Sequence, residues 1–162
     1  TGLIAFDREI RAFLPPVGGP AASRHILQVI CNLHATLEEP DYESVFALLR
    51  TRIKRRCLVI LFSNLVDEAT AELLQKLFAM QQRHLLLWIC LRDPGIEAMV
   101  DQSPEQPNAS WEQGAAAELL LWRRKVLDQA QSKGVLLIDA APREFTPALL
   151  ERYLEIKARH LL

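Results

Sequence analysis

The sequence lacks several of the signals that usually reveal what a protein does. Its 162 residues include three cysteines, Cys31, Cys57 and Cys90, an odd number at irregular spacing that forms neither a disulfide framework nor a zinc site. No apolar run approaches the ~20 residues of a membrane-spanning helix, and no signal peptide opens the chain. There is no Gly-x-Gly-x-x-Gly motif and no Walker loop, which argues against a phosphate-cradling loop.

An excess of charge is also missing. The chain has 19 basic and 20 acidic residues and a net charge of −1, so it offers no global reason to bind nucleic acid or an anionic membrane. Its composition, 50% hydrophobic and 24% charged, is that of a globular protein of one domain. Pairing of a cysteine with a histidine for nucleophilic catalysis stays open, although apolar surroundings would raise the pKa of each cysteine. The histidines have no metal-ligand spacing: His25, His34, His84 and His160.

The spacing of apolar residues predicts alternating strands and helices. Continuous apolar runs at residues 58–62, 85–91 and 135–138 are typical of parallel strands covered on both faces. A short run at residues 3–6 and an alternating one at 9–13 predict a β-hairpin. The fold class is therefore α/β, with helices on both faces of a parallel sheet. Helices are expected at residues 21–37, 42–53 with Asp41 as N-cap, 67–83, 111–132 ended by Gly134, and 147–161, with a loop at 101–110.

Candidate site residues follow the predicted strands. Ligands of open parallel sheets bind at the carboxyl ends of the strands, which here carry Ser63 and Asn64, Arg92 and Asp93, and Asp139. Such Asp and Asn residues also serve as turn and cap residues, and this structural role stays open for Asp93 and Asp139.

A basic run lies at the end of the second predicted helix: Arg50, Arg52, Lys54, Arg55 and Arg56. Cations at a helix C-terminus complement the helix dipole, and a docking patch for an acidic partner is the alternative interpretation. The tryptophans are expected to pack in the core rather than to form a stacking platform: Trp88, Trp111 and Trp122.

The whole chain also resembles a known family. Four segments carry the resemblance in order: IAFDREIRAFLPP, RRCLVILFSNLVD, RHLLLWICLRDPGIEAM and KGVLLIDAAPREFTPALLERYLEIKAR. They are similar to the C-terminal half of bacterial von Willebrand factor A-like proteins of unknown function (domain-of-unknown-function family fifty-eight), typically encoded beside MoxR-type AAA ATPases. The resemblance implies a doubly wound, mostly parallel, Rossmann-like sheet with an antiparallel edge hairpin. The first central strand would be missing, and the chain, which opens at Thr1, is expected to be a piece of a longer protein.

The resemblance further implies a degenerate metal-ion-dependent adhesion site. Its Mg²⁺ ligands in the superfamily are an Asp-x-Ser-x-Ser motif, a threonine before a helix and an aspartate after a later strand. Here the motif is absent, the threonine position is Pro40 and the aspartate position is Asn64. Replacing a carboxylate by an amide removes about 4 kcal/mol of attraction, roughly a thousandfold in affinity. No cofactor is therefore expected, and Mg²⁺ only if the missing N-terminal motif restores the site.

The leading hypothesis is a protein–protein interaction module rather than an enzyme. It would act as partner or adaptor of a MoxR-type AAA ATPase in the assembly or maturation of other proteins. The partner would bind the strand-end face through Asp41, Ser63, Asn64, Arg92 and Asp93.

Other interpretations remain. A metal-assisted hydrolase or phosphatase-like enzyme would use Asp93 and Asp139 in a crevice at the same strand ends. An oligomerising structural subunit is a third hypothesis. The strand edges left by the missing strand predict internal closure or pairing with a second copy, because exposed apolar edges recruit other chains. No nucleic acid and no direct membrane contact are expected of this cytoplasmic domain, although the whole protein would be membrane-anchored upstream, as its relatives are.

Overall fold

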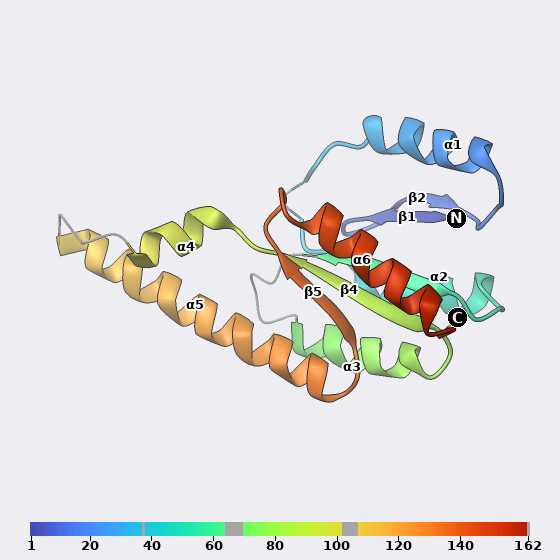
Figure 1. Ribbon diagram of the computed structural model, residues 1–162. Helices are drawn as coiled ribbons and strands as arrows, with labels where there is room; N and C mark the ends of the chain where they lie inside the picture. The colour runs from blue at the N-terminus through green and yellow to red at the C-terminus, as the bar shows by residue number, and fades with distance from the viewer. Residues whose placement is uncertain (37, 64–69, 102–106, 162) are drawn as a thin grey trace. The chain divides into compact units, whose positions relative to one another are not determined.

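The computed structural model describes residues 1–36, 38–63, 70–101 and 107–161. Two compact units make up the chain, Thr1–Arg55 and Arg56–Leu162. The mixed α/β fold predicted from the sequence is confirmed, with an antiparallel hairpin in the first unit and a parallel three-stranded sheet in the second (Figure 1).

The first unit contains the hairpin and two helices. β1 (Leu3–Phe6) pairs with β2 (Ile10–Leu14), and α1 (Pro20–Cys31) and α2 (Tyr42–Arg52) follow. The Asp7 carboxylate stabilises the hairpin turn by accepting hydrogen bonds from the Glu9 amide (3.0 Å) and the Arg11 Nε (2.7 Å). These bonds lower the pKa of Asp7 to about 2.

Helix α1 is shorter than the predicted helix at residues 21–37. It ends at Cys31, where the Asn32 side chain donates to the Gln28 carbonyl (2.9 Å) and the Asn32 amide bonds to the Val29 carbonyl. Asn32 thus occupies carbonyls of the last turn, as a C-capping residue does, and the chain leaves the helix there.

The second unit contains β3 (Leu58–Ser63), β4 (Leu85–Leu91) and β5 (Leu136–Ala140), in the parallel order β3-β4-β5. Three helical segments fit the predicted pattern: α3 (Thr70–Gln81), α5 (Pro107–Ser132) and α6 (Phe145–Ala158). Gly134 follows α5 with φ 84°, a left-handed conformation that glycine adopts without strain, which confirms its predicted role.

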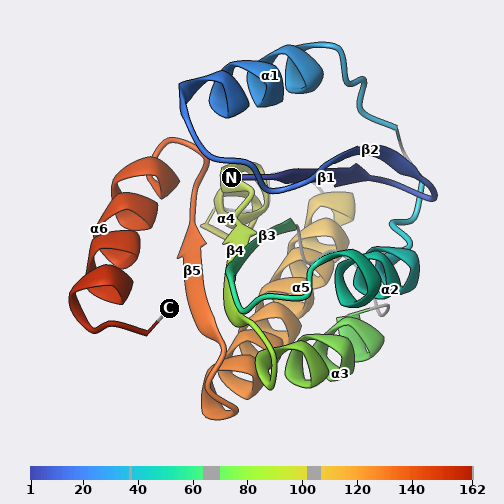
Figure 2. The same ribbon diagram turned by 90° about the vertical axis from the view of Figure 1, so that its right-hand side faces the viewer.

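Helices cover both faces of the parallel sheet (Figure 2). On one face α6 packs on Leu87, Ile89 and Ile138, which form a buried cluster with Ile156 of the helix. On the other face, α3 and α5 cover the residues that alternate with these, including Trp88, whose side chain is fully buried as predicted.

Three features of the second unit differ from the prediction. Residues 94–101 form a further helix, α4 (Pro94–Asp101), and α5 begins at Pro107, inside the predicted loop. An Asp–Pro pair can end a strand, but it can also begin a helix. Here it begins α4: the Asp93 side chain accepts a hydrogen bond from the Gly95 amide (2.8 Å), and Pro94 occupies the first helical position. Trp111 is also 82% exposed, and so it does not share the buried face of α5.

Candidate functional site

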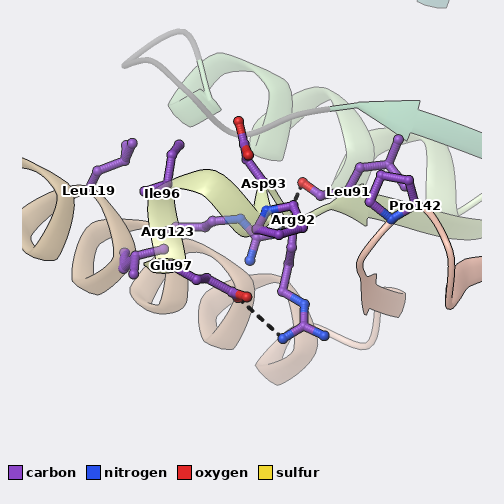
Figure 3. A pocket seen from close by; sticks show the side chains of 10 residues that line it. Leu91, Arg92, Asp93, Ile96, Glu97, Leu119, Arg123 and Pro142 are labelled. Carbon is purple, nitrogen blue, oxygen red and sulfur yellow. Dashed lines mark hydrogen bonds and ion pairs between the residues drawn. The ribbon is translucent and has the colours of Figure 1, made fainter. Parts of the chain in front are cut away.

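A cavity of about 340 Å³ opens at the carboxyl ends of β4 and β5, between these ends and helices α4 and α5 (Figure 3). We call it the strand-end crevice. Its position is the one that open parallel sheets use for ligands. Pro142 lies at the opposite end of the crevice from Leu119 (Figure 3). The apolar walls come from Leu91, Pro94, Ile96, Leu119, Leu120 and Pro142.

A buried arginine forms the base of the crevice. Arg123 of α5 is only 8% exposed, and its guanidinium grips Asp139 with two hydrogen bonds, Nη2 to Oδ1 (2.7 Å) and Nη1 to Oδ2 (3.1 Å). The same Nη2 donates to the carbonyl of Cys90 (3.2 Å). The strand register places Cys90 opposite Asp139, so one side chain ties the ends of β4 and β5 together. Such a bidentate clamp, with the arginine buried and the carboxylate partly exposed, fixes geometry as well as charge.

A second arginine closes the rim of the crevice. The Arg92 guanidinium contacts Glu97 through Nη1 (3.3 Å) and Glu144 through Nη2 (3.0 Å), and its Nε lies 3.9 Å from Asp139 Oδ1. That separation is too long for a hydrogen bond, and the buried Nε has no hydrogen-bond partner in the described part of the chain. Arg92 therefore lies among three carboxylates, those of Glu97 in α4, Asp139 in β5 and Glu144 just before α6.

The carboxylates in and beside the crevice already have partners: Glu97, in its lining, contacts Arg92, and Asp139 lies next to the lining residues Arg92 and Arg123. Asp139 is held by Arg123, and Asp93 caps α4 through its bond from the Gly95 amide. A general acid or base needs a group that is free to exchange protons with a substrate. In this arrangement the charges of Arg92, Asp93 and Asp139 organise the crevice instead.

The predicted site residues fall into different places. Arg92 and Asp93 both line the strand-end crevice. The Ser63 hydroxyl, at the end of β3, accepts a hydrogen bond from the Trp88 indole (2.7 Å). In the first unit, Asp41 caps α2 as predicted, accepting from the Ser44 amide (3.0 Å). Asn64 lies outside the described residues, and the binding roles assigned to these five residues stay predictions.

The described residues at the end of β3 offer one side-chain oxygen, the Ser63 hydroxyl, as a candidate ligand for a magnesium ion. Mg²⁺ needs several oxygen ligands at near-octahedral positions, whereas the Ser63 hydroxyl already accepts from an indole. Among the side chains that the structure describes, no three of His, Cys, Asp or Glu gather as metal ligands would. The loss of the metal from this strand end stays a prediction.

One cysteine–histidine pair does form, at the opposite ends of the strands. Cys57 Sγ lies 3.5 Å from His84 Nδ1, just before β3 and β4. Burial raises the pKa of the Cys57 thiol and lowers the pKa of His84, so both groups are held in their neutral forms. A neutral thiol is a poor nucleophile, which argues against the catalytic reading of this pair.

Sequence reasoning missed Arg123, the residue on which the crevice depends. A signal was present, because Arg123 falls at helical spacing with the buried Ala116, Leu127 and Ala130. A cation on the buried face of a helix needs a partner, and the predicted core strands offered two acids at their ends, Asp93 and Asp139.

These features define a mixed α/β protein with a charge-clamped crevice at the ends of its parallel strands. The chain belongs to the family described as "Protein of unknown function DUF58", which matches residues 1–104. The matched part includes Arg92 and Asp93 but ends before Arg123 and Asp139, and so it is shorter than the whole-chain resemblance. The comparisons with curated proteins and with solved structures found no match. None of the helices in the described ranges has the length and apolar character needed to cross a membrane.

Proposed function

We propose that the strand-end crevice is a docking site for a protein partner, and that the chain works as an interaction module. The observation that carries the proposal is a concave site with apolar walls, in which Arg92, Glu97 and Arg123 are held in ion pairs and Asp93 accepts a bond from a backbone amide. Its volume of about 340 Å³ is at the small end of ligand pockets, which run from ~300 to ~1,000 Å³. Such a site suits one anchoring side chain of a partner better than a whole cofactor.

The rigid frame of the crevice supports the same proposal. Arg123 fixes the strand ends from below and Arg92 links the rim, so the walls are held in place before a partner arrives. A preorganised site loses less conformational entropy on binding than a mobile one. The alternative hydrolase would need Asp93 and Asp139 as free carboxylates, and both are engaged within the protein.

The proposed partner is a MoxR-type AAA ATPase, with the chain as its adaptor in the assembly or maturation of other proteins. This part depends on the resemblance to von Willebrand factor A-like proteins, as does the proposal of a cytoplasmic domain with a membrane anchor upstream. The same resemblance underlies the proposed degenerate metal site. Calorimetric titration with Mg²⁺ tests it: no binding is expected, and micromolar affinity would revive the metal site.

Binding of a purified MoxR-type ATPase to immobilised chain tests the docking proposal. Leu119→Arg places a charge in the apolar wall of the crevice and is expected to weaken binding about thirtyfold, the loss of roughly 2 kcal/mol at an interface hot spot. The matched control is Leu121→Arg on the same helix, because Leu121 is 72% exposed and lies outside the crevice lining. Equal binding by both variants would exclude the crevice, and absence of binding by the unmodified chain would exclude this partner.

A further inference from the structure

Strand β3 forms one edge of the parallel sheet. It lies wholly within the second unit and pairs with β4 along its whole length, from Leu58 to Ser63. Within the ranges that the structure describes, no strand pairs with its other side. A strand edge of this kind presents unpaired backbone N–H and C=O groups, and so it is a template for the addition of a further strand.

One hydrogen bond identifies the residues whose backbone groups face the outer side of β3. The Leu85 amide donates to the Cys57 carbonyl (3.0 Å), so the backbone groups of Cys57 point toward β4. Successive residues of a strand direct these groups to alternate sides. Leu58, Ile60 and Phe62 therefore direct their N–H and C=O groups outward, and in the described part of the chain these groups form no hydrogen bond on that side.

The outer edge of β3 lacks the features that protect edge strands in natural proteins. Its sequence, LVILFS, contains no charged residue and no proline, and its register with β4 runs without a bulge. The side chains also stay uncovered. Ile60 is 37% and Phe62 is 49% exposed, although the Phe145 ring at the start of α6 contacts the Phe62 ring edge to face (5.9 Å between centroids). An added strand would remove both the backbone groups and these side chains from water.

The sequence of β3 is complementary to itself when two copies run antiparallel. A two-fold axis at Ile60 places Ile60 opposite the same residue of the second copy, and Leu58 opposite Phe62. Because these are the outward residues, each opposed pair exchanges two hydrogen bonds, as in an antiparallel ladder. On the other face Val59 lies opposite Leu61, so every pair is apolar and no like charges meet. A strand with charges at these positions would instead bury them against Ile60 and Phe62.

We infer that the outer edge of β3 pairs with the same edge of a second copy of the chain, antiparallel and with Ile60 on the two-fold axis. The two sheets then join into one, in the order β5-β4-β3-β3-β4-β5. Such a pairing occupies the outer β3 edge of both copies and closes at a dimer. It does not involve the strand-end crevice, which opens at the carboxyl ends of β4 and β5, and so it does not depend on the proposed docking partner.

Sedimentation velocity of the full chain tests the inference, and a dimer is expected. Ile60→Lys places two like charges opposite each other on the axis and is expected to weaken dimerisation about tenfold or more. Lysine fits this position in a single copy, because Ile60 is 37% exposed and its amide faces outward. The matched control is Leu150→Lys on α6, where Leu150 is 58% exposed, and dimerisation should change less than about twofold. Circular dichroism checks that the variants are folded.

A mixture of two variants tests the register of the pairing. Ile60→Glu alone should weaken dimerisation as Ile60→Lys does. Mixing the two in equal amounts should restore it, because a carboxylate of one copy then lies opposite an ammonium group of the other. An effect of the substitutions on the fold of each copy would not be reversed by mixing.

Several outcomes would overturn the inference. An unmodified chain that stays monomeric at the highest soluble concentration would remove the interface, and a dimer that persists in Ile60→Lys would place it elsewhere. Equal loss in Leu150→Lys would assign it to the surface of α6. Assembly beyond a dimer would exclude a closed pair, and a mixture that stays monomeric would exclude the two-fold axis at Ile60.

Discussion

Replacement of Arg123 by methionine tests the energetic role of the clamp beneath the crevice. Methionine retains the apolar stem of the arginine side chain but not the guanidinium beyond it, so every hydrogen bond of that group is removed. Asp139 loses both of its short bonds, at 2.7 and 3.1 Å, and the Cys90 carbonyl loses a donor. The perturbation is therefore confined to the ends of β4 and β5.

The expected cost follows from burial. Removing one partner of a fully buried ion pair costs about 3–5 kcal/mol, because a charge is left without compensation. The Asp139 side chain is 35% exposed, so water restores part of what is lost. The free energy of unfolding should fall by about 2–3 kcal/mol. Adding Asp139→Asn to Arg123→Met should cost little more, because the stranded charge is then gone.

Urea unfolding followed by circular dichroism measures these values. The control is Arg152→Met, which breaks the 2.6 Å contact between Arg152 Nη1 and Glu155 Oε2 on the surface of α6. A surface pair of this kind contributes about 0.2–1 kcal/mol. If Arg123→Met costs no more than the control, the clamp does not hold the strand ends, and the argument for a rigid crevice fails.

Three further predictions concern other parts of the molecule. Asp41→Ala should lower the free energy of unfolding by about 1 kcal/mol in urea titrations, because the Ser44 amide at the start of α2 loses its acceptor, whereas Asp41→Asn should retain most of it. Burial lowers the pKa of His84 below its ordinary 6.5, so the unfolded chain binds this proton more tightly than the folded one. Stability should be fully present above pH 6.5 and fall as the pH drops below it, and unfolding curves of His84→Phe between about pH 5.5 and 7 should lose this dependence. Burial raises the pKa of Cys57, so iodoacetamide should label it more slowly than the exposed Cys31 at neutral pH, and equal labelling rates would contradict its burial.

The strands were predictable because their physical signature is local. Residues 85–91 form a continuous apolar run and β4 is buried along its length, as expected of a strand covered on both faces. Residues 58–62 form a similar run and were also predicted correctly as a strand, although Ile60 and Phe62 of β3 stay 37% and 49% exposed. The strand-end rule then located Arg92 and Asp93, which do line the crevice.

The helix boundaries were less predictable because their signals are ambiguous. The Asp93–Pro94 pair fits a strand-ending turn and a helix start equally well, and the choice depends on the contact of α4 with α5. The end of α1 depends on a single asparagine side chain, and the apolar spacing beyond Asn32 suggests that the helix continues.

The role of Arg123 was out of reach for a different reason. The clamp joins residues 16 and 33 positions away, and its geometry depends on the register between β4 and β5. Register and helix placement are tertiary properties, so a sequence pattern gives the buried position of the arginine without naming its partners. The crevice walls from α5 were missed for the same reason.

Hydrogen–deuterium exchange of the chain with and without the MoxR-type ATPase tests the docking claim most directly. The account predicts slower exchange in the partner-bound state at the backbone amides of residues 91–97 and 119–123, which surround the strand-end crevice, with the change absent in Leu119→Arg. Binding that leaves these amides unchanged and protects only the α6 surface would contradict it.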